Sequence, residues 1–384
     1  MLKTIDLFAG AGGLSLGFEM TGQFEVLAAA EINKNAQATY RKNLTAGKEN
    51  FIFIDNVLGC DFASLSECLG GVDIVIGGPP CQGFSNANRQ KNHLISMNNG
   101  LVKEYFRAIK EIRPKAFIME NVNMLRSDTH RFYESTKDCK EINQLRENGY
   151  DIPKREDTLC VSEEVFKNIN YSEIEEINFE QFVIPTELLH LISVLNKNIG
   201  NATRLPKFLR KNSKDIVRRI DTVLASQANA DLALDSTVIE RLTIIKDALE
   251  TGNVEEEKKD ISYVVNLEKM ISTVSEIKNN GLIGKFSVRE DGALVYKVNS
   301  YSVIDYVNAI LGGEYIQVGN TVNAEWFGVP QERRRYIVMG IRKDLYPNVE
   351  PELPTQLEEQ KKVSVGEAIM DLASYEAGFR YMIG

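Results

Sequence analysis

This sequence of 384 residues is poor in the side chains that hold metals and disulfides. It has three histidines, far apart, and five cysteines, an odd number without a Cys-x-x-Cys pair. This pattern argues against a disulfide framework and against a structural zinc site. We therefore expect a reducing, cytoplasmic location and no bound metal. If the chain is an enzyme, its chemistry would use carboxylate, thiol or guanidinium groups.

The sequence also lacks long apolar runs and an excess of positive charge. No run approaches the roughly 18 apolar residues that a membrane helix needs. Asp6 falls where a signal peptide requires apolar residues, so we expect neither membrane association nor secretion. The formal net charge is −9, which is unlike a protein that wraps nucleic acid over its whole surface. Any binding to nucleic acid would need a local basic patch or a second chain.

Hydrophobic residues make up 43% of the sequence. At roughly 150 residues per domain, the length predicts two to three domains. In the first 124 residues, short apolar strands alternate with helices, which is typical of an α/β fold with a doubly wound, mostly parallel, Rossmann-like sheet. In such sheets ligands bind at the carboxyl ends of the strands. Strands are predicted at residues 4–8, 26–30, 51–54, 72–76, 116–119 and 336–340, and helices at 14–19 and 101–112.

The middle of the chain has a different character. Residues 125–299 are dense in Glu and Lys, with apolar residues at helical spacing, and are predicted to form a mainly helical insert. The insert would separate an α/β half, residues 1–124, from a segment that returns to the same domain, residues 300–384. Alternation on both sides of Asp291-Gly292 predicts a hairpin.

One stretch of the insert is strongly basic. Between Arg204 and Arg219 it holds seven basic residues and a single acid, Asp215. A helical face with that charge could contact phosphates. The alternative is a solvated basic helix that is balanced by the acidic stretches on either side.

Several polar or glycine-rich segments directly follow the predicted strands. The loop from Ala9 to Gly13 lies between a strand and a helix, where backbone N–H groups can receive an anion, although a glycine-rich turn alone is a weak signal. Glu31 ends the second strand about 20 residues later, where an acid can hold ribose hydroxyls. Asp55 ends the third strand and could accept a hydrogen bond from an adenine amino group.

Pro79-Pro80-Cys81-Gln82 is the sharpest feature. Two prolines stiffen a loop directly after a buried strand and present one cysteine at the ligand edge of the sheet. A lone cysteine is usually a small buried hydrophobe, but one placed here is better interpreted as a nucleophile. Glu120 ends the neighbouring strand and could face the thiol. Arg333 and Arg335 precede the last predicted strand and, with a period of two residues, would point to the same side.

These motifs, in this order, resemble those of the DNA (cytosine-5-)-methyltransferases, the type found in bacterial restriction-modification. The resemblance rests on Asp6–Gly13, Gly78–Ser85, Glu120–Val122 and Gln331–Arg335, and covers about residues 1–125 and 300–375. It implies the Rossmann-like fold of enzymes that use S-adenosyl-L-methionine, with double-stranded DNA as the partner. The reaction would transfer a methyl group to carbon 5 of a flipped cytosine.

The resemblance also implies a role for each matching residue. Cys81 would attack the base, Glu120 would address ring nitrogen 3, and Arg335 would bind the carbonyl oxygen with support from Arg333. Glu31 would bind the ribose hydroxyls, Asp55 the adenine amino group, and Leu101 would line the adenine pocket. The residues implied for cofactor binding are Phe8, Ala9, Gly10, Ala11, Gly12, Gly13, Glu31, Asp55, Pro79 and Leu101.

The sequence departs from the family after the arginine motif. Family members usually carry a target-recognition region there, followed by a last Gly-Asn-rich motif, yet 49 residues follow Arg335. Residues 319–322 (Gly-Asn-Thr-Val) resemble that motif superficially but precede the arginines, so we predict a turn at the end of a strand. Three explanations remain open: a split enzyme whose partner chain supplies recognition, a truncated product, or an insert that took over recognition. The first two are favoured because the missing motif also serves the cofactor.

Other functions remain to be weighed. An RNA cytosine-5 methyltransferase is one alternative, because some relatives of this fold methylate transfer RNA. A non-catalytic subunit that binds S-adenosyl-L-methionine is less consistent with the complete set Cys81, Glu120, Arg333 and Arg335. A site that no longer catalyses a reaction tends to lose some of its catalytic residues. A nicotinamide oxidoreductase would give no reason for Pro-Pro-Cys-Gln.

Overall fold

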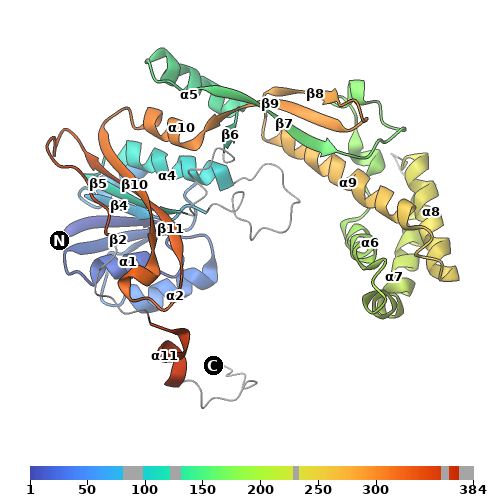
Figure 1. Cartoon of the computed structure of the whole chain (residues 1–384), viewed down its shortest axis with the longest axis horizontal. Coiled ribbons are helices and arrows are strands. Elements are labelled where there is room, and N and C mark those ends of the chain that lie inside the picture. The colour runs from blue at the N-terminus through green and yellow to red at the C-terminus, as the bar shows by residue number, and fades with distance from the viewer. Residues whose placement is uncertain (81–97, 122–130, 228–232, 356–362, 372–384) are drawn as a thin grey trace.

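The computed structural model describes residues 1–80, 98–121, 131–227, 233–355 and 363–371. Figure 1 shows an α/β part around one sheet, an insert of helices on the opposite side, and a second sheet that joins them. Among the residues described, no helix combines the length and apolar character needed to cross a membrane.

The α/β part contains a seven-stranded sheet in the order β10-β11-β5-β4-β1-β2-β3. Strands β1 to β5 run parallel, whereas β11 is antiparallel to both β5 and β10. The predicted doubly wound, mostly parallel sheet is confirmed. The strands are β1 (Leu2–Leu7), β2 (Phe24–Ala30), β3 (Ile52–Ile54), β4 (Ile74–Gly77), β5 (Ala116–Asn121), β10 (Tyr315–Asn323) and β11 (Arg334–Arg342). The strand order reverses between β1 and β4, and this reversal opens a crevice at their carboxyl ends.

Helices pack on this sheet because its strands are apolar on both faces. Ile5, Leu7, Val75 and Phe117 are fully buried, as expected for parallel strands covered on each side. The helix that follows β2 begins at the Asn33 cap, whose side chain accepts hydrogen bonds from two backbone N–H groups of the first turn. The helices of this part are α1 (Gly13–Glu19), α2 (Lys34–Leu44), α3 (Phe62–Cys68), α4 (Asn98–Ile112) and α10 (Val303–Ile310).

A second, antiparallel sheet connects the α/β part to the insert. Its central strand pairs with one long strand along one edge, and with two short strands in succession along the other. The strands are β6 (Arg131–Tyr133), β7 (Lys154–Ser162), β8 (Gly284–Val288) and the central β9 (Leu294–Ser302). The predicted hairpin at Asp291-Gly292 is confirmed as the β8–β9 connection, where Gly292 has a φ of 87°.

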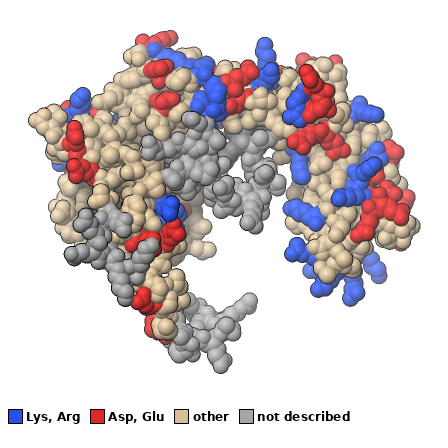
Figure 2. Space-filling view, viewed as in Figure 1, with Lys and Arg blue, Asp and Glu red and all other residues tan. Residues whose placement is uncertain are grey.

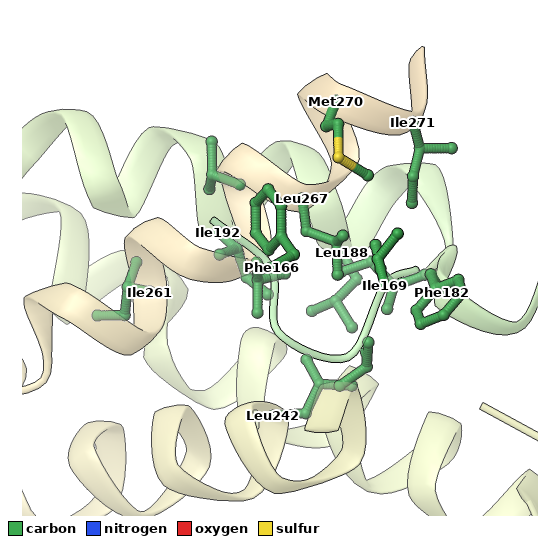
Figure 3. Close-up of a cluster of buried hydrophobic side chains, with 14 of the residues drawn as sticks. Phe166, Ile169, Phe182, Leu188, Ile192, Leu242, Ile261, Leu267, Met270 and Ile271 are labelled. Carbon is green, nitrogen blue, oxygen red and sulfur yellow. The ribbon is translucent and has the colours of Figure 1, made fainter. Parts of the chain in front are cut away.

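The insert has its own hydrophobic core, which Figure 3 shows in close-up. Leu188, Ile192, Leu242 and Leu267 come from three helices and meet in it, all at most 1% exposed. The helices of this core are α6 (Thr186–Asn198), α7 (Arg204–Ser226), α8 (Ser236–Thr251) and α9 (Lys258–Asn279). Helix α5 (Thr136–Glu147) packs instead on the core of the α/β part, through Ile142 and Leu145. Short 3₁₀ turns cover Tyr171–Glu173, Phe179–Phe182 and Ala324–Phe327, and a last short helix is α11 (Val365–Ile369).

The prediction of a turn at residues 319–322 is wrong, because these residues lie inside β10. Gly319 pairs with Val338 of β11 in regular antiparallel register. A Cβ atom on Gly319 would come within 2.3 Å of the Tyr336 hydroxyl oxygen. The glycine is therefore explained by a tyrosine that packs over the strand, not by a change of chain direction.

Candidate functional site

The glycine-rich loop after β1 adopts a conformation that few residues tolerate. Phe8 has a φ of 61°, and Gly10 and Gly12 have φ values of 56° and 93°. A Cβ atom on Gly12 would lie 2.2 Å from Leu44 Cδ1, so this turn requires glycine for space as well as for its backbone angles. A non-glycine residue with positive φ, such as Phe8, is uncommon and marks a strained segment next to a site.

Glu31 ties this loop to the end of β2. Its Oε2 accepts the Gly10 N–H at 2.9 Å, and its Oε1 accepts the Asn33 N–H at 2.7 Å. Both oxygens keep a lone pair for a ligand hydroxyl. The carboxylate is thus held in one orientation at the carboxyl edge of the sheet.

Asp55, just after β3, is connected to the same network. It receives hydrogen bonds from Lys34 Nζ at 2.8 Å and Gln37 Nε2 at 2.9 Å, and Gln37 also donates to the Glu31 carbonyl oxygen. The hydrogen bond from Lys34, followed by that from Gln37, lowers the pKa of Asp55. Asp55 therefore stays an acceptor at neutral pH.

A cavity of about 820 Å³ opens at this edge. Of the residues predicted to bind the cofactor, Phe8, Glu31, Asp55 and Leu101 line it. Gly78 and Pro80 form another wall, whereas the 9–13 loop and Pro79 are not among its described lining.

Part of the cavity wall comes from residues that the sequence did not indicate. They belong to the segment just after β2, to α4, to β6 and to the base of the insert. They include Ile32, Asn33, Lys103, Phe132, Tyr133, Ser135, Lys137, Asp138, Asn280 and Leu282. The insert residues reach the cavity because β6 pairs with β9, about 170 residues later, and no local pattern reveals that pairing.

Lys103 fixes the position of α4 beside this wall. Its ammonium group lies 2.6 Å from Asp138 Oδ2 and donates to the Tyr301 hydroxyl at 2.8 Å. It also lies 4.7 Å from the centre of the Phe132 ring, within range of a cation–π interaction. Burial lowers its pKa, but the adjacent Asp138 carboxylate opposes that shift. These contacts join α4 to α5 through Asp138 and to the second sheet through Tyr301.

Asp6 lies buried beneath the glycine-rich loop. Its Oδ2 accepts a hydrogen bond from Ser15 Oγ at 2.5 Å, and Ser15 in turn contacts the Tyr40 hydroxyl. Its Oδ1 has no partner within the described part of the chain. Burial raises the pKa of Asp6 to about 7, although the hydrogen bond from Ser15 opposes the rise.

We expect Asp6→Asn to change how stability depends on pH. The neutral carboxyl stabilises the fold fully below about pH 4, and this contribution disappears as the pH rises through about 7. The amide that replaces the carboxyl group cannot ionise. The free energy of unfolding of the variant, relative to that of wild type, should therefore rise by on the order of 3 kcal/mol from pH 5 to pH 8. Urea unfolding at both pH values measures the difference. Equal pH dependence in the two proteins would contradict a raised pKa at Asp6.

Glu120 and the two predicted arginines converge at the end of β5. Arg335 Nε lies 2.7 Å from Glu120 Oε1, and Arg333 Nη2 lies 3.9 Å from the same oxygen. Arg334 points elsewhere and pairs with Glu332. The antiparallel register, with Glu120 opposite Ile337, brings the carboxylate beside the arginines. Arg333 and Arg335 therefore lie on the same side of the chain, as their two-residue spacing predicted.

The loop that leads to Cys81 begins against this ion pair. A Cβ atom on Gly78 would lie 3.2 Å from Glu120 Oε2, and Asn121 Nδ2 donates to the Pro79 carbonyl oxygen at 3.2 Å. Cys81 itself lies outside the described residues. The segment from Gly78 to Pro80 thus touches both the cavity and the Glu120–Arg335 pair.

The described residues contain no group of three or more His, Cys, Asp or Glu side chains that could hold a metal ion. The polar groups gathered at this edge are instead suited to hydrogen bonding. Carboxylates at Glu31 and Asp55 can accept from hydroxyl and amino groups, and the guanidinium of Arg335 can donate to a carbonyl oxygen.

Comparison with known proteins matches two segments of the chain, close to those that carry the motifs of the sequence analysis (about residues 1–125 and 300–375). The family model for "C-5 cytosine-specific DNA methylase" matches residues 2–155 and 312–382, more than half of the chain. The match leaves out most of the insert, including α6 to α9.

Individual relatives each align with part of the chain. Type II methyltransferase M.XorII of Xanthomonas oryzae is 40% identical over 151 residues, which is 38% of this chain and 34% of that protein. M.FnuDI of Fusobacterium nucleatum is 39% identical over 39% of this chain and 40% of its own length. M1.HphI of Haemophilus parahaemolyticus is 33% identical over 57% of this chain and 67% of its own length. The chain thus spans between about a third and two thirds of these relatives.

Proposed function

The chain belongs to the C-5 cytosine-specific DNA methylase family, and from this premise we propose that it methylates carbon 5 of cytosine in duplex DNA, as part of restriction-modification. The methyl donor would be S-adenosyl-L-methionine, and the target base would leave the duplex to reach the site. The observation that carries the proposal is the convergence at one sheet edge of the cavity, the Glu120–Arg335 pair and the loop that precedes Cys81.

The cavity has groups that fit this cofactor. The fixed carboxylate of Glu31 would accept hydrogen bonds from ribose hydroxyls, and Asp55 would accept one from the adenine amino group. Leu101 offers an apolar surface to the adenine ring. The cofactor would supply an electrophilic methyl group, and this chain's residues would hold it at the end of β1.

The base would be activated by the chain's own side chains. The thiolate of Cys81 would add to carbon 6 of cytosine, forming a sulfur–carbon bond and making carbon 5 a nucleophile. Negative charge then develops on the ring. The Glu120 carboxyl at nitrogen 3 and the Arg335 guanidinium at the carbonyl oxygen would stabilise it, with Arg333 nearby. After methyl transfer, water or another base would accept the proton from carbon 5. The electrons of that bond would restore the double bond between carbons 5 and 6, break the sulfur–carbon bond and release Cys81 as the thiolate.

We expect Glu31→Ala to weaken binding of S-adenosyl-L-methionine by about ten- to a hundredfold, because two hydrogen bonds to a charged acceptor would be lost. Isothermal titration calorimetry measures this affinity. Glu25→Ala, which changes an acid at the other end of β2, is the matched control and should bind like wild type. Equal affinity of wild type and Glu31→Ala would contradict the placement of the cofactor.

The reaction itself is tested by transfer of a labelled methyl group to plasmid DNA, mapped by bisulfite conversion. The assay should be run with the chain alone and with the product of the adjacent reading frame, which separates a self-sufficient enzyme from one subunit of a split enzyme. Label in cytosine carbon 5 of the duplex supports the proposal. Label in transfer RNA but not in duplex DNA would favour an RNA methyltransferase instead.

A further inference from the structure

Helix α7 of the insert has two opposite faces. Leu205, Ile216, Ile220 and Val223 are buried in the core of the insert. The opposite face carries the basic residues of the first three turns. We define the basic stripe as the five exposed residues Arg204, Lys207, Arg210, Lys211 and Lys214.

The stripe is narrow and continuous. At 100° per residue its five members fall within an arc of about 120°, centred opposite the buried residues, and extend over about 15 Å of helix. Within the described residues none of the five forms an ion pair. The next cations along the helix differ, since Arg218 and Arg219 both pair with Asp215, and Arg219 also pairs with Glu187.

Folding alone does not account for this arrangement. Like charges three and four residues apart destabilise a helix by about 0.2–0.5 kcal/mol per pair, and the stripe contains several such pairs. Solubility does not require it either, because the chain's net charge of −9 already keeps molecules apart, and the stripe reduces that charge. The stripe is therefore better explained by an anionic partner.

The position of α7 suits a partner that also reaches the catalytic edge. Figure 2 shows Lys and Arg side chains over the free end of the insert, where Figure 1 places α7, bordering the hollow between the insert and the α/β part. About 15 Å of duplex carries roughly four to five phosphates on each strand, so five cations over that length match the charge spacing of one strand.

We propose that the basic stripe of α7 binds the phosphate backbone of the duplex whose cytosine enters the catalytic site. This inference rests on the proposed function for its partner, and it assigns the insert a role in holding DNA. Lysine and arginine contacts to phosphates position a duplex but do not read its sequence. The stripe would therefore contribute affinity independent of base sequence.

The test is the binding of a fluorescein-labelled 30-base-pair duplex to the whole chain, measured by fluorescence anisotropy over a range of NaCl concentrations. The test variant is the triple Lys207→Gln, Lys211→Gln, Lys214→Gln. The control is the triple Lys42→Gln, Lys110→Gln, Lys343→Gln, which removes the same charge. Its residues lie at the last turns of α2 and α4 and just after β11, at the sheet edge opposite the site.

The stripe variant should bind the duplex about tenfold or more weaker at about 0.1 M salt, with a salt slope shallower by about 2 to 3. The control should stay within about twofold of wild type, and all three proteins should bind S-adenosyl-L-methionine equally, which shows that they are folded. An equal loss in stripe variant and control would overturn the inference. So would a stripe variant that binds duplex like wild type but loses binding to RNA. These outcomes are independent of methyl transfer, whose absence in wild type would contradict the proposed function alone.

Discussion

Cys81→Ala should reduce methyl transfer to background, a loss of about 10⁴-fold or more, because no other group could form the bond to carbon 6 of cytosine. Affinity for S-adenosyl-L-methionine should stay within about twofold, since the cavity is lined by Glu31, Asp55 and Leu101. Transfer of tritiated methyl groups to duplex DNA, together with calorimetry, measures both quantities.

The matched control is Cys68→Ala, which removes an exposed thiol from the end of α3. It should transfer methyl groups at the wild-type rate. Substantial activity in Cys81→Ala, or an equal loss in both variants, would show that the thiol at position 81 is not the nucleophile.

Glu120→Gln should lower the methyl-transfer rate by about 10² to 10³-fold, the usual effect of removing one group that stabilises charge in a transition state. Glutamine keeps the size of the side chain but can neither carry a proton to nitrogen 3 nor attract Arg335, whose Nε lies 2.7 Å away. Stability should change little, because Glu120 and Arg335 are about a third exposed and such pairs contribute at most about 1 kcal/mol. Single-turnover kinetics at saturating cofactor measures the chemical step.

Glu332→Gln provides the comparison, because Glu332 pairs with Arg334 in the same motif but points away from Glu120. We expect its rate to equal that of wild type. If both variants lose activity equally, the effect lies in the arginine segment as a whole. If neither does, Glu120 has no part in the chemistry.

The strands and the edge at which they end could be predicted from local sequence. The apolar runs that became β2 and β4 have no polar face, which is typical of a parallel sheet covered on both sides. Because parallel strands end at a common edge, polar groups at the ends of separate strands, such as Glu31 and Asp55, were predicted to lie together. The two-residue period likewise placed Arg333 and Arg335 on one side.

The rest depends on contacts that no local pattern encodes. The base of the insert lines the cavity because β6 pairs with β9, and Lys103 reaches Asp138 and Tyr301 only once that second sheet has formed. Residues 319–322 were predicted to form a turn at the end of a strand, because they precede the arginine motif and so could not be the family's last motif. In the fold the missing side chain of Gly319 makes room for Tyr336, a requirement set by the neighbouring strand.

Two glycines at the end of β4 explain how the cavity and the ion pair come so close. A Cβ atom on Gly77 would lie 2.3 Å from the Leu7 carbonyl oxygen, so β4 can run against β1 only without a side chain there. Gly78 likewise leaves room for the Glu120 side chain, because a Cβ atom on Gly78 would lie 3.2 Å from Glu120 Oε2. The described chain leaves this point through Pro79 and Pro80, which directly precede the predicted nucleophile Cys81 in the sequence.

The proposed covalent bond between Cys81 and cytosine is tested most directly by mass spectrometry. The chain is analysed after incubation with S-adenosyl-L-methionine and duplexes that contain 5-fluorocytosine. Fluorine at carbon 5 prevents the final elimination, so the sulfur–carbon bond should persist. We expect a covalent adduct of protein and oligonucleotide that maps to the peptide containing Cys81. Methyl transfer to ordinary duplex without any such adduct, or an adduct at another residue, would contradict the proposed bond.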